Sequence, residues 1–132
     1  MKGRLSIVAT IQQRLPKLLG IYAFGSRIEG HAGPESDLDL AVLVEGYADP
    51  HLLWQLSGDL ADLAACPVDL LDFRAASTVM QSRILTTGER WWAADSRADA
   101  YEAAVLNEKL ALDAARAPLL NDIQREGHVY GR

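Results

Sequence analysis

One short motif restricts the possible fold more than any other feature of this 132-residue sequence. The pair Gly25-Ser26 is followed by ten residues, then by Asp37 and Asp39 on either side of a leucine. Apolar residues alternate over 38–44, which predicts a β-strand with one polar end. Side chains two residues apart on a strand project from the same face, so the two carboxylates repel each other unless a cation lies between them.

A divalent metal ion is the usual partner of such a pair, and carboxylate oxygens favour Mg²⁺ or Mn²⁺ over zinc. Asp69 lies in a later strand-like stretch and supplies a third carboxylate. Three carboxylates can hold two metal ions about 3.5 to 4 Å apart, which aligns an attacking oxygen, an α-phosphorus and a leaving pyrophosphate. Gly25 allows the backbone to approach a phosphate closely, and Ser26 offers a hydroxyl and an N–H group.

The remaining sequence predicts a small mixed sheet covered by helices. Helices are expected near the N-terminus as far as Pro16, and over 50–65, 77–85 and about 96–126. Strands are expected over 20–25, 38–44 and 68–73, with a brief extended piece at Trp91 and Trp92. This order indicates an α/β (α+β) fold. Residues 1–132 are expected to form a single domain, because one core suits this length and no linker or repeat interrupts it.

Composition excludes several functions. The formal net charge of −5 argues against direct nucleic acid binding, which needs clustered Lys and Arg. Cys66 is the only cysteine, so no internal disulfide or cysteine-based zinc site can form, and a reducing, cytoplasmic location is expected. No stretch approaches the roughly 20 apolar residues needed to cross a bilayer, so no membrane association is expected.

The motif resembles the signature of the nucleotidyltransferase superfamily that includes DNA polymerase beta. The resemblance rests on Gly25-Ser26, the ten-residue spacer and the segment 36–40. Small size and the Gly-Ser-Arg start make the chain most similar to minimal nucleotidyltransferases of the MntA type, which are antitoxins paired with HEPN-domain toxins of the HepT type. Residues 125–131 resemble the short tail that follows the last helix in that family.

The resemblance implies a polymerase beta-like nucleotidyltransferase fold with a long C-terminal helix, and it implies roles for the carboxylates. Asp37 and Asp39 match the metal-binding pair. Asp69 matches the third carboxylate, which acts as general base or completes a second metal site. Two Mg²⁺ ions are the implied cofactor, with Mn²⁺ as an alternative, and ATP is the implied substrate.

The nucleotide-binding residues follow from the same resemblance. The turn 25–26 matches the segment that holds the triphosphate, and Arg27 and Ser36 belong to the same implied set. The family often continues Gly-Ser-Arg-Ala-Arg-Gly, whereas Ile28 and Glu29 stand here. An acid near a triphosphate is unfavourable, so Glu29 is expected to point away from it, and the departure affects nucleotide affinity or base choice.

The implied activity is transfer of AMP from ATP to a tyrosine hydroxyl of the HEPN ribonuclease toxin, which silences the toxin in a type VII toxin-antitoxin system. Two alternatives stay open at this point. In the first, the chain is an antitoxin that acts by binding the toxin, without AMP transfer. In the second, it is an enzyme that modifies a small molecule such as an aminoglycoside.

Other conspicuous residues have simpler structural interpretations. His31 is expected on a surface loop, Asp72 at the surface or as a cap, and Trp54 and Cys66 in the core. Trp91 and Trp92 are expected to serve core and interface rather than to stack on adenine. Arg83 and Arg90 are expected to be solvated. The apolar side chains of the last helix are expected to pack on the sheet or on a partner; they are Tyr101, Leu106, Leu110 and Leu112.

Overall fold

The computed structural model describes the backbone of residues 3–30, 33 and 36–125, and side chains in these ranges as far as residue 118. The helices are α1 (Arg4–Arg14), α2 (Ser26–Glu29), α3 (Pro50–Ala64), α4 (Thr78–Thr87) and α5 (Ser96–Arg125), with a 3-10 helix η1 (Phe73–Ala75). The strands are β1 (Leu18–Phe24), β2 (Leu38–Val44), β3 (Val68–Asp72) and β4 (Glu89–Ala93).

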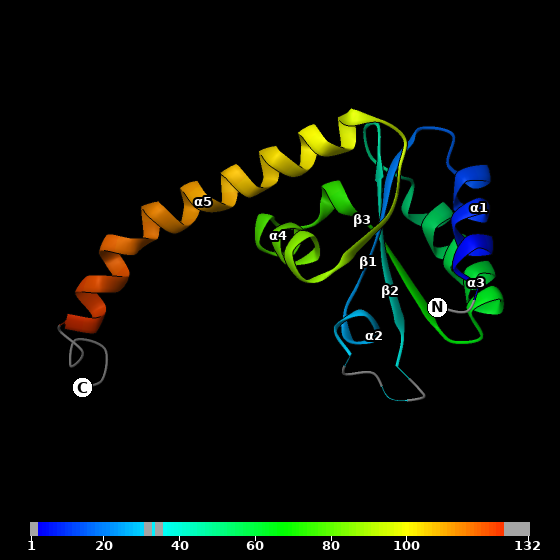
Figure 1. Ribbon diagram of the computed structural model, residues 1–132, viewed down its shortest axis with the longest axis horizontal. Helices are drawn as coiled ribbons and strands as arrows, with labels where there is room; N and C mark the ends of the chain where they lie inside the picture. The colour runs from blue at the N-terminus through cyan, green and yellow to red at the C-terminus, as the bar shows by residue number, and fades with distance from the viewer. Residues whose placement is uncertain (1–2, 31–32, 34–35, 126–132) are drawn as a thin grey trace.

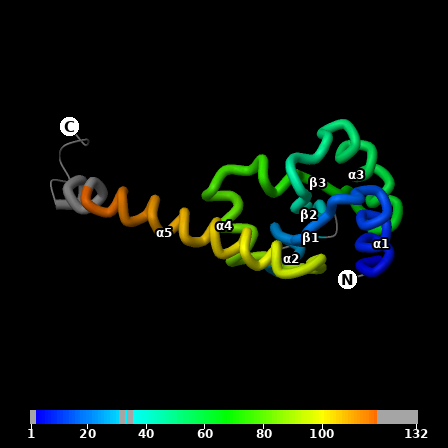
Figure 2. Tube along the Cα trace, turned by 90° about the horizontal axis from the view of Figure 1, so that it is seen from above, coloured from blue at the N-terminus to red at the C-terminus, as the bar shows by residue number. Residues whose placement is uncertain are grey.

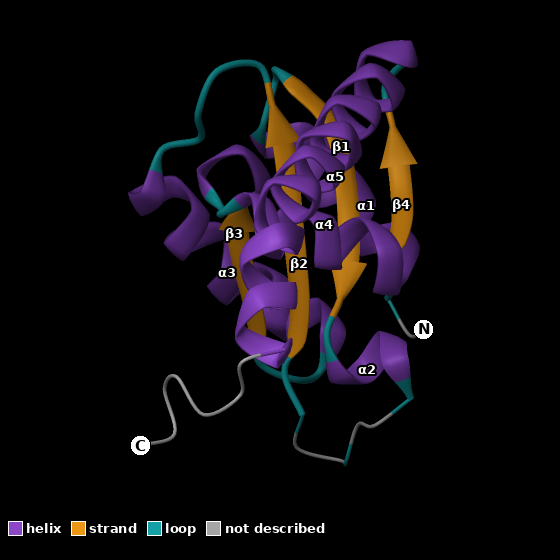
Figure 3. Cartoon of the chain, turned by 90° about the vertical axis from the view of Figure 1, so that its left-hand side faces the viewer, coloured by secondary structure: helices purple, strands orange, loops and turns teal. Residues whose placement is uncertain are grey.

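The strands form one mixed sheet in the order β3-β2-β1-β4. Strand β1 is antiparallel to both β2 and β4, whereas β2 and β3 are parallel (Figure 3). The predicted mixed sheet, its flanking helices and the long C-terminal helix are confirmed. Strand β4 is an addition, because the sequence suggested only a brief extended piece at this position.

Helices cover both faces of the sheet (Figure 1). We call the face under α1 and α3 the back face and the face under α4 and α5 the front face. Alternate residues of β2 divide between them: Leu38, Leu40 and Val42 belong to the back core, and Ala41 and Leu43 to the front core. The period-2 pattern of the sequence therefore fixes which way each side chain of β2 points.

Local sequence signals set the helix boundaries. The Asp49 carboxylate accepts a hydrogen bond from the backbone N–H of His51, with proline in the first turn of α3, as predicted for a capped start. The Ser77 hydroxyl accepts from the N–H of Met80 at 3.2 Å and caps α4. Gly88 follows α4, where an added Cβ would lie 2.5 Å from the carbonyl oxygen of Ala23. Close backbone contact with β1 therefore requires glycine there.

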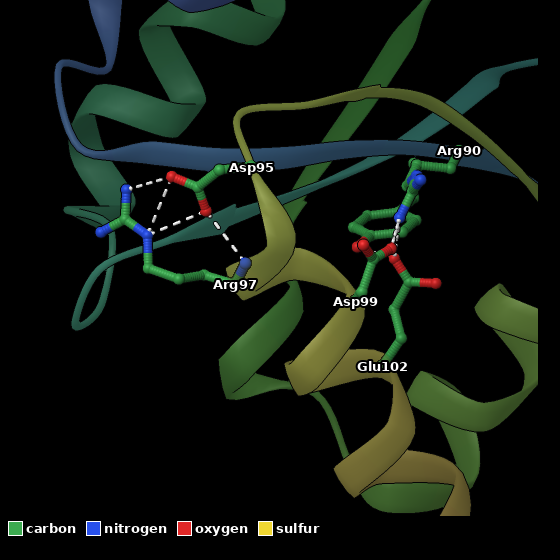
Figure 4. A network of polar contacts seen from close by, with 6 residues as sticks. Arg90, Asp95, Arg97, Asp99 and Glu102 are labelled. Atoms are coloured by element: carbon green, nitrogen blue, oxygen red, sulfur yellow. Dashed lines mark hydrogen bonds and ion pairs between the residues drawn. The ribbon is translucent and has the colours of Figure 1, made fainter.

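A polar network fixes the first turns of α5 to the sheet (Figure 4). The Tyr22 hydroxyl donates to Glu102 at 2.8 Å, and Arg90 donates to both Asp99 and Glu102, at 2.6 and 2.9 Å. Arg90 is thus ion-paired rather than simply solvated. Further along α5, Val105 lies in the front core and Glu108 accepts a hydrogen bond from Thr78 of α4 at 3.2 Å. The later turns of α5 extend away from the sheet and from the other helices (Figure 2).

One expected core position is wrong and another is confirmed only in part. Trp54 is 74% exposed, because α3 packs through Leu53, Leu56 and Leu60 and residue 54 lies on its outer side. Cys66 is only half-buried, although it packs against the back core. On α5, Tyr101 packs against the front core and Leu112 is half-buried. Leu106 and Leu110 are exposed, so the expected contact of these two leucines with a partner stays a prediction.

None of the helices in the described ranges is both long enough and apolar enough to cross a membrane.

Candidate active site

The three predicted carboxylates lie at one end of the sheet. Asp39 and Asp69 are direct partners in the parallel pairing of β2 with β3, and Phe24, the last residue of β1, is opposite Asp39 on the other side. Asp37 directly precedes β2. Asp39 and Asp69 each lie two residues before a residue of the front core, Ala41 and Leu71, so these two carboxylates project from the front face.

Gly25 makes the closest backbone approach to this group. Its φ of 82° and ψ of −166° lie in a region that only glycine adopts readily. An added Cβ would overlap with Oδ2 of Asp39. The sequence pointed to Gly25 for phosphate approach; the structure shows that glycine is already needed to make room for the Asp39 carboxylate.

The carboxylates repel one another. The pKa of Asp39 is raised above its ordinary value, first by burial, then by the negative charges of Asp69 and Asp37. Asp37 and Asp69 are themselves exposed. A cation at this position would relieve the repulsion, and three aspartates offer it hard oxygen ligands.

The described residues do not form a closed metal cage. No three described His, Cys, Asp or Glu side chains converge on one metal position as they stand. Magnesium does not require such a cage, since it is usually held by one or two carboxylates together with waters and substrate phosphates. Asp37 and Asp39 therefore fit a metal ion that binds jointly with a nucleotide.

Arg27 and Ser36 brace the segment that leads to the carboxylates. Nε of Arg27 donates to the backbone oxygen of Ser36 at 2.7 Å, and the Ser36 hydroxyl accepts from the N–H of Gly33 at 2.9 Å. These contacts hold the residue directly before Asp37. Their predicted contact with nucleotide stays a prediction.

The neighbouring predictions have mixed outcomes. Glu29 lies 4.0 Å from Arg83, so a positive charge partly offsets it. Asp72 is a cap, as expected, because it accepts from the N–H groups of Arg74 and Ala48. Trp91 is in the back core, so its core role is confirmed, and it lies on the opposite face from the carboxylates. His31 and the tail 126–131 lie outside the described residues.

A groove on β3, η1 and the start of α4 could not be predicted from the sequence. A cavity of about 390 Å³ is lined by Leu71, Asp72, Ala75, Ala76, Ser77 and Met80. Leu71 is two residues beyond Asp69 and therefore on the same face of β3. The groove is formed by β3, η1 and the start of α4, and no single segment carries its pattern.

A glycine turn packed against paired carboxylates at the end of a mixed sheet defines the class of protein. Residues 6–97 match the family "Polymerase beta, Nucleotidyltransferase", and the chain belongs to this family. The predicted family resemblance is thereby confirmed.

Individual proteins and solved structures within this family are also similar to the chain. The protein adenylyltransferase MntA of Shewanella oneidensis is 32% identical over 117 residues, which cover 89% of this chain and 84% of the relative. A chain of a crystal structure of a toxin-antitoxin with AMP-PNP superposes with a TM-score of 0.79 at 30% identity, covering 92% of this chain and 98% of that chain. A chain from the structure of tri-AMPylated Shewanella oneidensis HEPN toxin in complex with MNT antitoxin gives 0.75 at 28% identity, covering 94% and 99%.

Proposed function

We propose that this protein is an adenylyltransferase antitoxin that transfers AMP from ATP to a tyrosine hydroxyl of a HEPN ribonuclease toxin. The main structural support for this chemistry is the pairing of Asp39 with Asp69 across β2 and β3, together with the close contact between Gly25 and Asp39. The substrate and partner are inferred from the relatives, of which one is an adenylyltransferase and another is complexed with an AMPylated HEPN toxin.

The three carboxylates have two different roles in this proposal. Asp37 and Asp39 hold a divalent metal ion, for which Mg²⁺ is the first candidate. When bound, the metal neutralises phosphate charge and orients the phosphates for displacement. Asp69 stands beside Asp39 and is more exposed, so it can accept the proton that the attacking tyrosine hydroxyl loses.

The proposed transfer is a single displacement at the α-phosphorus of ATP. The tyrosine oxygen forms a bond to the α-phosphorus of ATP, the bond from that phosphorus to the bridging oxygen breaks, and pyrophosphate leaves. Gly25 and Ser26 line the turn at the start of α2, where backbone N–H groups can hold the leaving phosphates. Arg27 and Ser36 assist by fixing the segment before Asp37.

The surroundings of the site suit a macromolecular acceptor. The groove beyond Asp69 is shallow and largely apolar at its surface, so it offers a contact area rather than an enclosing pocket for a small acceptor. The net charge of −5 favours a basic partner, and a protein that binds RNA carries positive charge. Electrostatic attraction would raise the association rate in a salt-dependent way.

Labelled ATP and Mg²⁺ test the proposal in three parallel incubations, with the HEPN toxin, with an aminoglycoside and with no acceptor. Label is expected on the toxin alone. Asp39→Asn should abolish the transfer, whereas the control Asp62→Asn, an exposed aspartate on α3, should retain it. Label on the aminoglycoside would support the small-molecule alternative, and neutralisation without label would support binding alone.

A further inference from the structure

A second cavity opens on the back face, on the other side of the sheet from the three aspartates. Its volume is about 450 Å³, within the range of small-molecule sites. The lining residues come from α1, α2, the end of α3 with the loop after it, and β4; they are Arg4, Arg27, Ile28, Ala64, Cys66, Glu89 and Trp91. Trp91 belongs to the back core and Ile28 packs against it, which places the cavity behind the turn that carries Ser26.

A β-bulge forms one wall of this cavity. The pairing of β1 with β4 shifts register between Ile21 and Tyr22, which are opposite Trp92 and Arg90. Trp91 is left without a direct partner, and both tryptophans contact the back core while Arg90 turns to the front. Bulges commonly redirect side chains in this way near binding sites.

Two positive charges line the cavity without a described counter-charge. The guanidinium carbon of Arg4 lies 5.1 Å from the centre of the Trp91 ring. Arg27 uses Nε for the carbonyl of Ser36, which leaves its two terminal nitrogens as donors. Within the described part of the chain, no acidic side chain lies within 4.0 Å of either guanidinium, although Glu89 lines the same cavity.

The start of α1, which carries Arg4, also favours an anion there. The N-terminus of α1 has no side-chain cap and no acidic residue in its first turn, so its positive end is not compensated by described side chains.

From these features we infer that the back cavity binds a small molecule that carries a phosphate or carboxylate group. The anionic group lies between Arg4 and Arg27. Glu89 accepts a hydrogen bond from a hydroxyl or amine of the same ligand and disfavours bare polyanions. The inference concerns binding alone and does not depend on the proposed AMP transfer.

Occupancy of this cavity would also affect the front site. Arg27 contacts the carbonyl of Ser36, the residue before Asp37, so a ligand that holds Arg27 also holds the start of the carboxylate motif. The two ligands would then alter each other's affinity by the same factor.

Tryptophan fluorescence and calorimetry test the inference in EDTA, where no metal supports nucleotide binding at the front. The background is Trp54→Phe, because Trp54 is exposed and contributes unrelated signal. The probes are inorganic phosphate, AMP and citrate, titrated at constant ionic strength. At least one should bind saturably with a Kd below about 1 mM. Comparing the Kd values of phosphate and AMP with that of citrate distinguishes a phosphate ligand from a carboxylate ligand.

Two variants locate the binding. Arg4→Ala should weaken it at least about tenfold, about 1.4 kcal/mol. The matched control Arg116→Ala removes the same charge from an exposed position on α5 and should leave binding unchanged. Glu89→Gln should tighten inorganic phosphate. Absence of saturable binding by all three probes, or equal losses in Arg4→Ala and Arg116→Ala, would overturn the inference.

Discussion

Asp39 and Asp69 face each other across the parallel pairing of β2 and β3, and each raises the negative potential at the other. Together with burial and the charge of Asp37, Asp69 raises the pKa of Asp39. The sheet therefore brings like charges together, and a side chain at position 25 would collide with the Asp39 carboxylate. Such an arrangement disfavours the empty, ionised site and favours a bound cation.

Asp39→Asn is expected to lower AMP transfer by at least about 100-fold, because metal-assisted charge stabilisation is worth several kcal/mol. Single-turnover rates with saturating ATP and Mg²⁺ measure the effect. Asp62→Asn provides the control. Near-normal rates in Asp39→Asn would rule out the proposed metal role of this carboxylate.

The stability of the metal-free protein should depend on pH through the same residue. Because the pKa of Asp39 is raised in the folded state above the ordinary 3.8, the folded protein binds this proton more tightly than the unfolded chain. Its contribution to the free energy of unfolding is therefore full below pH 3.8 and is lost as the pH rises through the raised pKa. Urea unfolding at a series of pH values should show this loss in Asp62→Asn but not in Asp39→Asn. Identical profiles in both variants would contradict the assignment.

Gly25→Ala should destabilise the fold by about 1 to 3 kcal/mol, because alanine does not readily adopt a φ of 82° with extended ψ. The added Cβ should also displace Asp39 and lower transfer activity. Gly58→Ala is the matched control: it lies within α3 with open space around it, so the same change should stabilise by about 0.5 to 1 kcal/mol. Thermal unfolding of both variants gives the comparison, and equal shifts in one direction would be inconsistent with this geometry.

Tyr22→Phe tests how α5 is fixed to the sheet. The change removes the hydrogen bond to Glu102 but leaves the ring stacked on Phe73, and Glu102 keeps its ion pair with Arg90. The free energy of unfolding should fall by about 1 kcal/mol, the usual net value of one hydrogen bond. Chemical denaturation measures it. A loss above about 3 kcal/mol would mean that the hydroxyl does more than bond to Glu102.

Much of the fold could be predicted because the local signals agree with the final packing. Apolar residues alternate over 38–44, and β2 buries alternate residues on opposite faces of the sheet. Strand β4 was not predicted as a strand, since its bulge breaks the alternation at Trp91 and Trp92. The expected core position of Trp54 is wrong, because α3 buries Leu53, Leu56 and Leu60 and leaves residue 54 on its outer side.

The site was predictable in part. A two-residue spacing places Asp37 and Asp39 on one side of a strand without any tertiary information. Their pairing with Asp69 depends on strand order, which the spacing does not determine. The back cavity could not be predicted from the sequence, because Arg4 and Trp91 lie far apart along the chain and come together only when α1 packs near β4.

Intact mass spectrometry of the HEPN toxin tests the central claim most directly. The toxin is incubated with this protein, ATP and Mg²⁺, and in parallel with the Asp37→Asn variant. The toxin mass should rise by one AMP unit or a small multiple with the unaltered protein, and stay unchanged with Asp37→Asn. A toxin that loses its ribonuclease activity with no change in mass would contradict AMP transfer and show that the protein neutralises by binding alone.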